Sequence, residues 1–319
     1  MLAGLAIFAV LGFALFNADS KTGLVTAKQS QTLKFAYAVG PYNAIPIIAL
    51  RKGFLAEEGF KIEEVRVSFI GYVFQQVSEN QIDALVGAET PAVFAAMKGV
   101  KYEILATHEE NLNDLVLVYR KDSGIKGISD LQGKKIGLPF TSVSHYNLWK
   151  NLIENNIDPA KVSLVDMAPQ NMASALKHGD VDAIFTFEPV PSIIKQGLGE
   201  EVGQFTPPSK WMMNLYSSKT LANESKKKII NAFLKAEKFI KENKKEAIAI
   251  VAKENSLSEE TLEKLWPLWD FHIKQFTGTK VMTEQANWAI QTKLVNASKV
   301  PDFSTMNNPL PLSQAVSEN

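Results

Sequence analysis

Three hydroxyl side chains, Thr141, Ser142 and Ser144, follow a short apolar segment, Lys135 to Leu138, that ends at Pro139. The apolar segment predicts a buried strand, and the apolar residues beyond the hydroxyl group have helical spacing. Because Ser and Thr are typical N-cap residues, the sequence predicts that a helix begins here. The free N–H groups of such a helix start, with the hydroxyls beside them, can hold an anion without Lys or Arg. An ordinary capped helix that binds nothing is the alternative.

Polar and aromatic side chains follow other predicted strands in the same way. Four loops, 40–43, 87–90, 140–145 and 187–189, lie at the carboxyl ends of predicted strands. We expect them to contain the following candidate ligand-binding residues: Tyr42 and Asn43; Glu89 and Thr90; Thr141, Ser142, Ser144 and His145; and Glu188. Open α/β sheets bind ligands at the carboxyl ends of their strands, so the same four loops are predicted to surround one site. None of these loops contains Lys or Arg, which argues against a highly charged ligand such as a nucleotide.

Two of these candidates carry carboxyl groups, Glu89 and Glu188, either of which can accept a hydrogen bond from an amine or an aminopyrimidine. The alternative for each is a solvated glutamate or a partner of a helix start. His145 is either a further donor to the ligand or a packed residue of the first helical turn.

Two aromatic candidates and one amide have similar alternatives. Tyr42 can stack on a flat ligand or form a wall of the site. Asn43 can bind the ligand or cap the helix that follows it. Trp211, which lies further along the chain, is an aromatic residue of the site or a residue of the core.

Predicted strands and helices alternate from residue 32 to about residue 191, which is typical of an α/β sheet covered on both faces. The pattern occurs twice, and Asp83-Ala84 and Asp182-Ala183 occupy corresponding positions in the two units. From about residue 204 the chain is predicted to be mostly helical, with one helix over 259–269. The last fifteen or so residues are rich in Pro, Ser and Asn and are predicted to form a loose tail.

Composition limits the classes of function. The 319 residues include 34 Lys and Arg and 34 Asp and Glu, and no long basic segment occurs, so nucleic acid is not an expected partner. The absence of Cys excludes disulfides, thiolate metal sites and a cysteine nucleophile. With four His and no metal-ligand, nucleophile-elbow or phosphate-loop spacing, we expect no metal, no cofactor and no enzymatic activity.

The N-terminus carries a signal for location. Leu2 to Phe16 is apolar throughout, about 15 residues long, which is short for a membrane span and typical of a secretory signal peptide. An uncleaved membrane anchor is the alternative. We therefore assign residues 1–31 to a signal peptide or anchor plus linker, and we expect the folded part at the periplasmic or extracellular face of the membrane.

Residues 32–215 resemble the periplasmic solute-binding proteins of ABC importers, in the subfamily for alkanesulfonates, taurine, nitrate and thiamine-pyrimidine precursors. The segments that carry the resemblance are Leu33–Tyr37, Ile47–Phe60, Gln81–Ala84, Ser129–Gly137 and Gly179–Pro189. Their order and spacing are specific, although no one of them is diagnostic. The sequence departs from the family at Phe187, where Trp is common before Glu-Pro.

The resemblance implies an α/β, two-lobed periplasmic-binding-protein-like fold of type II. Each lobe would be a mixed sheet flanked by helices, and a hinge would join them. Lobe 1 would comprise 32–117 and 214–319, and lobe 2 would comprise 118–213, with ligand in the cleft between them. The implied partners are a small ligand and a membrane permease, and the implied state is a monomer.

The ligand is left open by the sequence. A small organic anion such as an alkanesulfonate, taurine or nitrate is the main expectation, and a thiamine-precursor aminopyrimidine is the alternative. A related fold makes the thiamine pyrimidine in fungi with a histidine and a Cys-rich iron segment, so a chain without Cys fits that enzyme poorly. A tethered sensory module is a further alternative.

Overall fold

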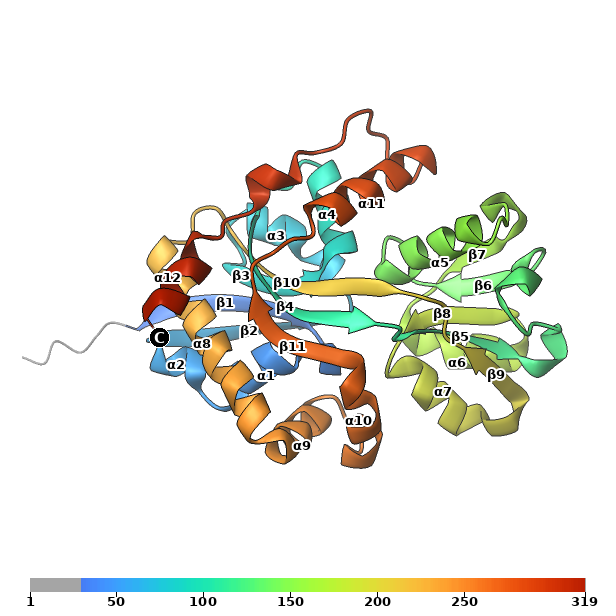
Figure 1. The fold of residues 1–319 in the computed structure, drawn as a ribbon, viewed down its shortest axis with the longest axis horizontal. Helices are drawn as coiled ribbons and strands as arrows, with labels where there is room; N and C mark the ends of the chain where they lie inside the picture. The colour runs from blue at the N-terminus through green and yellow to red at the C-terminus, as the bar shows by residue number, and fades with distance from the viewer. Residues whose placement is uncertain (1–29, 319) are drawn as a thin grey trace, which may run out of the picture.

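The structure is a computed structural model that describes residues 30–318. The predicted signal peptide or anchor therefore lies outside the described residues. Two sheets, each covered by helices, form two lobes that lie side by side (Figure 1). No helix in the described part of the chain is long and apolar enough to cross a membrane.

The first lobe is built on a six-stranded mixed sheet with the strand order β11-β4-β10-β3-β1-β2. Strands β1, β2 and β3 are parallel, whereas β10 runs antiparallel to both β3 and β4. The strands are β1 (Gln31–Ala38), β2 (Phe60–Val67), β3 (Ala84–Ala88), β4 (Glu103–Leu112), β10 (Lys210–Ser217) and β11 (Trp269–Lys274). The central strands are buried on both faces, which explains their nearly continuous apolar sequence.

The second lobe is built on a five-stranded mixed sheet with the order β7-β6-β8-β5-β9. Strand β6 is parallel to β7 and β8, and β5 is antiparallel to β8 and β9. The strands are β5 (Leu115–Arg120), β6 (Lys135–Leu138), β7 (Ser163–Asp166), β8 (Ala183–Phe187) and β9 (Val202–Phe205). The predicted mixed sheets with flanking helices are thus present in both lobes.

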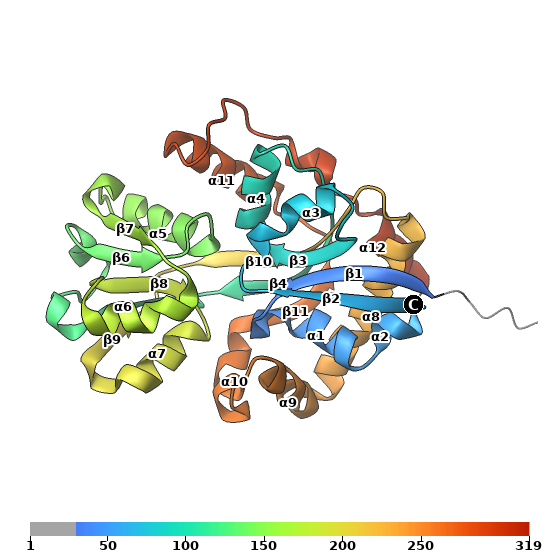
Figure 2. The same cartoon turned by 180° about the vertical axis from the view of Figure 1, so that it is seen from behind.

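Helices cover both faces of each sheet (Figures 1 and 2). Those of the first lobe are α1 (Ala44–Arg51), α2 (Phe54–Glu57), α3 (Phe74–Ser78), α4 (Glu89–Met97), α8 (Asn223–Glu242), α9 (Lys244–Glu254), α10 (Glu259–Leu265), α11 (Thr279–Gln291) and α12 (Leu310–Glu318). Those of the second lobe are α5 (Val143–Glu154), α6 (Met172–His178) and α7 (Val190–Leu198).

The chain passes between the lobes earlier than predicted. Leu115 already pairs with β8 and Lys210 already pairs with β4, so the crossings lie at 113–114 and 206–209. The predicted boundaries at 117/118 and 213/214 are therefore a few residues too late. Both predicted boundaries fall inside continuous strands, β5 and β10. The sheet with which each strand pairs shows to which lobe it belongs, and that pairing is a property of the tertiary structure.

Two expectations for the C-terminal region are wrong. The helix predicted over 259–269 ends at Leu265, and Trp269 begins strand β11, which pairs with the edge of β4. The predicted loose tail contains α12, in which Leu312 and Ala315 are buried against α8. Pro311 lies in the first turn of that helix, where proline is tolerated, so a proline-rich composition did not indicate disorder here.

The two lobes also touch through an aromatic cluster that we call the Trp288 cluster. Trp288 of α11 is buried against Phe94 of α4 in the first lobe and against Tyr146 and Trp149 of α5 in the second. The ring centroids lie 5.8 Å, 5.3 Å and 6.3 Å from that of Trp288, respectively. This contact connects the lobes at a place separate from the two chain crossings.

Candidate ligand-binding cleft

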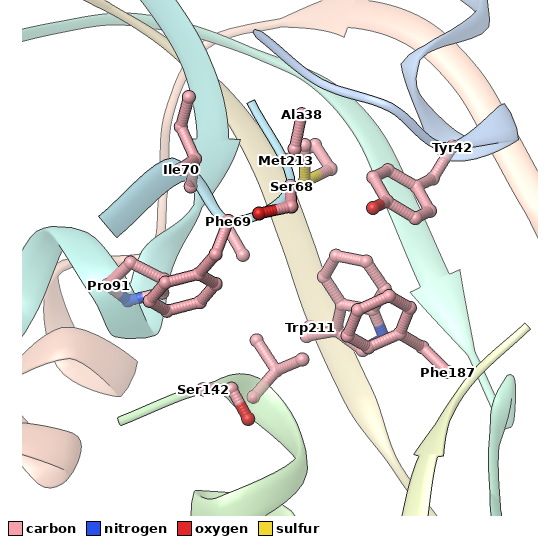
Figure 3. A pocket seen from close by; sticks show the side chains of 12 residues that line it. Ala38, Tyr42, Ser68, Phe69, Ile70, Pro91, Ser142, Phe187, Trp211 and Met213 are labelled. Atoms are coloured by element: carbon pink, nitrogen blue, oxygen red, sulfur yellow. The ribbon is translucent and has the colours of Figure 1, made fainter. Parts of the chain in front are cut away.

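A cleft between the lobes is lined by loops at the carboxyl ends of strands from both sheets. The smaller of its two parts, which we call the inner chamber, has a volume of about 50 Å³ and is lined by Tyr42 and Phe69 of the first lobe and Ser142 and Phe187 of the second. Its outer part, the outer chamber, has a volume of about 400 Å³ and shares Phe69 and Phe187 with the inner one. Figure 3 shows the side chains around the inner chamber.

Four of the ten candidate residues line this cleft. Tyr42, Ser142 and Trp211 line the inner chamber, and Thr141 lines the outer one. These residues come from two separate loops and from strand β10, so the structure brings together parts of the sequence that are far apart. Tyr42, Thr141 and Ser142, which follow β1 and β6, thus lie around one space, and their role in ligand binding stays a prediction.

Three polar candidates of the first lobe instead lie in its interior. Asn43 donates from Nδ2 to the carbonyl oxygen of Ala38 at 2.8 Å, and it makes no side-chain cap to the helix after it. Both carboxylate oxygens of Glu89 accept hydrogen bonds within the protein, from the Met212 N–H and from Gln285 Nε2, each at 3.0 Å. Thr90 is fully buried beside Glu89. None of the three lines the cleft.

Three candidates of the second lobe also lie behind the cleft surface. Ser144 is fully buried, and the ring of His145 is stacked on Phe140 with the ring centroids 4.6 Å apart. Burial lowers the pKa of His145 to about 4, so the imidazole is neutral at pH 7. Glu188 accepts a hydrogen bond from the Ser192 N–H at 3.1 Å and is almost fully buried. None of these three side chains lines either chamber.

The turn before α5 has the predicted form of a capped helix start. Ser142 is the N-cap residue, and its Oγ accepts a long hydrogen bond from the His145 N–H at 3.4 Å. Thr141 has a φ of 58°, a left-handed conformation that β-branched residues rarely adopt and that costs about 1–3 kcal/mol. Helix geometry leaves the first N–H groups of α5 without intrahelical acceptors, and two residues of this turn, Ser142 and Val143, line the inner chamber.

Several cleft residues were missed by the sequence analysis. Ser68, Phe69 and Tyr72 follow β2, and Asp166 ends β7; all four line the outer chamber. The rule about carboxyl ends of parallel strands would have found both loops, because β2 and β7 are parallel strands too. Their polar residues resemble those of ordinary surface loops, so no local pattern set them apart.

Buried carboxyl groups lie behind the inner chamber. Asp114, at the first chain crossing, accepts hydrogen bonds from the indole N–H groups of Trp211 at 2.6 Å and Trp269 at 3.3 Å. Burial raises the pKa of Asp114 to about 7 and that of Glu109 well above its usual value. Burial, followed by the nearby Asp114 and Glu109 carboxyls, also raises the pKa of Tyr42. Burial thus disfavours the charged forms of these carboxyl groups and of the Tyr42 hydroxyl.

Basic residues are missing from the cleft surface. Among the residues that line either chamber, all of them within the described residues 30–318, none is Lys or Arg. The described residues also contain no group of three or more His, Asp or Glu side chains placed to hold a metal ion. An anion in this cleft would therefore be held by neutral N–H and O–H donors.

The buried position of Glu89 leads to a testable prediction about pH and stability. Burial raises the pKa of Glu89 from 4.5 to about 7, so the folded chain holds this proton more tightly than the unfolded chain does. The resulting contribution to stability is complete below pH 4.5 and is lost as the pH rises through 7. From pH 5 to pH 8 the loss amounts to about 2–3 kcal/mol, since one pKa unit corresponds to about 1.4 kcal/mol.

Glu89→Gln removes this titration. The fall in unfolding free energy from pH 5 to pH 8, measured by urea denaturation, should be smaller by about 2–3 kcal/mol in the variant, because the other titrating groups cancel in the comparison. The variant can keep its hydrogen bonds, since Gln285 Oε1 has no partner and can accept from the new amide if the Gln285 amide turns over. The same pH dependence in both chains would contradict the raised pKa of Glu89.

A family model described as "NMT1/THI5 like" matches residues 41–251. The taurine-binding periplasmic protein of Escherichia coli is 29% identical over 152 residues, which are 46% of this chain and 46% of that protein. The chain spans about half the length of the curated relatives it matches.

Solved structures share the fold. The periplasmic aliphatic sulphonate binding protein SsuA of Escherichia coli has a TM-score of 0.75 and 18% identity, over 86% of this chain and 97% of that one. The desulfurization enzyme DSZB has a TM-score of 0.65 and 15% identity, over 90% of this chain and 99% of that one. At these identities the likeness establishes the fold alone, which is the periplasmic-binding-protein fold with two mixed sheets.

Proposed function

Since the chain belongs to the NMT1/THI5-like family, we propose that it is the solute-binding receptor of an ABC importer and captures a small organic sulfonate in the cleft between its lobes. The observation that carries the proposal is the cleft itself, because loops from both lobes and the start of α5 line one space. The names of the sulfonate-binding relatives favour this ligand class over nitrate.

The geometry suits reversible capture of a singly charged anion. Ser142 and Val143 line the inner chamber. A sulfonate at the start of α5 would accept hydrogen bonds from the backbone N–H groups of these two residues. The outer chamber of about 400 Å³ has room for the rest of a small ligand. Neutral donors hold an anion without a buried countercharge, whose desolvation would be costly.

Binding in such a two-lobed receptor is coupled to closure. The two short crossings at 113–114 and 206–209 would serve as the hinge, and ligand contacts to both lobes would stabilise the closed arrangement. The closed chain, acting as a monomer on the outer side of the membrane, would present its two lobes to a permease. We expect the ligand to be recovered unchanged after release, as for a receptor and unlike an enzyme.

The test is a ligand panel on the purified chain. A sulfonate present at a hundred times its dissociation constant should raise the unfolding free energy by about 2.7 kcal/mol, which thermal denaturation detects. Taurine, propanesulfonate, nitrate and an aminopyrimidine form the panel, and chromatography of the ligand after incubation tests for turnover. Stabilisation by the aminopyrimidine alone would favour a receptor for a thiamine-precursor aminopyrimidine. The flat ring of that ligand would lie against the rings of Tyr42, Phe187 and Trp211. No response to either sulfonate would contradict the proposed function.

A further inference from the structure

The two chain crossings are hydrogen-bonded to each other where they pass between the lobes. The Asn113 N–H donates to the carbonyl oxygen of Ser209 at 3.1 Å, and the Ser209 N–H donates to Asn113 Oδ1 at 3.2 Å. Asn113 has a φ of 60°, a left-handed conformation that Asn adopts more readily than most residues. Because the crossings share these hydrogen bonds, we expect them to move together when the lobes rotate.

Asp114, the next residue, is held by both lobes. Its main chain continues the pairing of β5 with β8 in the second lobe, since its carbonyl oxygen accepts from the Glu188 N–H at 3.1 Å. Its side chain is bound to the first lobe, because Oδ1 accepts from Trp211 Nε1 at 2.6 Å and Oδ2 accepts from Trp269 Nε1 at 3.3 Å. Asp114 therefore lies at the pivot of any rotation of one lobe against the other.

Trp211 connects this pivot to the cleft. Its ring lines the inner chamber, and its ring centroid lies 5.7 Å from that of Tyr42 in the first lobe and 6.1 Å from that of Phe187 in the second. Figure 3 shows these three rings gathered on one side of the chamber. Phe187 directly precedes Glu188, whose N–H donates to Asp114. Asp114 thus holds Trp211 through its side chain and the segment of Phe187 through its main chain.

The Trp211 indole depends on an acceptor of this kind. Trp211 is 2% exposed, and its N–H can only donate, so burial without a partner would be costly. Asp114 is fully buried, and burial raises its pKa to about 7, so at pH 8 the carboxylate predominates and can accept from both indoles. Without this acceptor the Trp211 ring would lose its fixed orientation, and ordering it again during ligand binding would cost affinity.

We propose that Asp114 is a positioning residue of the receptor, which fixes the Trp211 ring in the wall of the inner chamber and ties that ring to the pivot between the lobes. Asp114 lines neither chamber, so it acts on the ligand through Trp211. This inference rests on the proposed function, because it concerns the affinity for a ligand captured in the cleft.

The test compares two substitutions of similar size. Asp114→Asn keeps one side-chain oxygen that can accept from an indole, whereas Asp114→Leu keeps none. Titration calorimetry at pH 8 with taurine and with propanesulfonate should show binding about 5- to 10-fold weaker in Asp114→Leu and about two- to threefold weaker in Asp114→Asn, the range expected for ordering one side chain. Equal losses in the two variants, or no loss in either, overturn the proposal. Binding of neither sulfonate by the unsubstituted chain overturns the proposed function itself.

A double-mutant cycle tests whether Asp114 acts through Trp211. Trp211→Phe keeps a ring but removes the N–H, so adding Asp114→Leu or Asp114→Asn to it should weaken binding by less than about twofold. Trp269→Phe is the matched control, because it removes the other indole donor to the same carboxyl group and Trp269 lines neither chamber. In that background the losses from both Asp114 substitutions should remain. Losses of the same size in the Trp211→Phe background would overturn action through Trp211.

Fluorine NMR of the chain labelled with fluorotryptophan follows the ring directly. The Trp211 signal is identified by its absence from Trp211→Phe. Without ligand, this signal should shift and broaden in Asp114→Leu and stay closer to its original position in Asp114→Asn, because the amide keeps one acceptor. Urea denaturation checks that each variant is folded, and Asp114→Asn alone carries both comparisons if Asp114→Leu does not fold. A Trp211 signal that is the same in the unsubstituted chain and in the folded variants would overturn the positioning role.

Discussion

Val143→Pro should weaken sulfonate binding by about 10- to 100-fold relative to Val143→Ala, while the unfolding free energies of the two variants differ by no more than about 1 kcal/mol. Val143 is the first residue of α5 and lines the inner chamber. Its N–H has no acceptor within the helix, so proline at this position removes a ligand donor without breaking a helical hydrogen bond. The preceding Ser142 has a ψ of 172°, an extended conformation that is compatible with a following proline.

The expected size of this effect follows from the strength of one hydrogen bond to a charged group. Such a bond contributes about 1.5–3 kcal/mol, and about 1.4 kcal/mol corresponds to a tenfold change in affinity. Val143→Ala is the control, because it also removes the branched side chain but keeps the N–H. Titration calorimetry on both variants compares them directly. If the proline and alanine variants bind a sulfonate equally well, the start of α5 only caps a helix.

Trp288→Ala should lower the unfolding free energy by about 3–5 kcal/mol, the usual cost of removing a large buried aromatic side chain. Trp288 is 1% exposed and contacts rings from α4 and α5, so its loss leaves a cavity between the lobes. We also expect weaker ligand binding, because this contact holds α5, whose first residue lines the cleft, against the first lobe. Urea denaturation measures the first effect and calorimetry the second.

Trp149→Ala provides the comparison for this prediction. Trp149 belongs to the same cluster and is only partly buried, so its removal opens less of a cavity and should cost less. Equal losses from the two substitutions would show that burial does not set their energies. A loss below about 1 kcal/mol for Trp288→Ala would contradict the role of this cluster in joining the lobes.

The resemblance of the chain to solute-binding proteins could be recognised from sequence because it depends on local features. The alternation of strands and helices, the helix start at Ser142 and the order of the family segments all concern residues close together in the chain. The rule that ligands bind at the carboxyl ends of strands then selected loops that do meet in the cleft. Fold class was predictable for this reason, and so was the place of the cleft that we propose as the site.

Individual site residues were harder to predict, because exposure depends on the tertiary structure. Glu89 and Glu188 follow strands just as Tyr42 does, but their carboxylates turn inward and accept hydrogen bonds from Met212 and Ser192. Phe69 and Tyr72 were missed, because an aromatic residue in a loop looks the same in sequence whether or not a second lobe lies opposite it.

The sequence by itself therefore determined the α/β class, the two similar units and the capped start of α5, because short-range periodicity and capping chemistry are written in adjacent residues. The tertiary structure decided where the lobes divide, that α12 packs on α8, and which side chains line the cleft. It also placed Asp114 behind Trp211, two residues 97 positions apart in the chain. Contacts of that kind depend on how two lobes meet, and no local pattern encodes them.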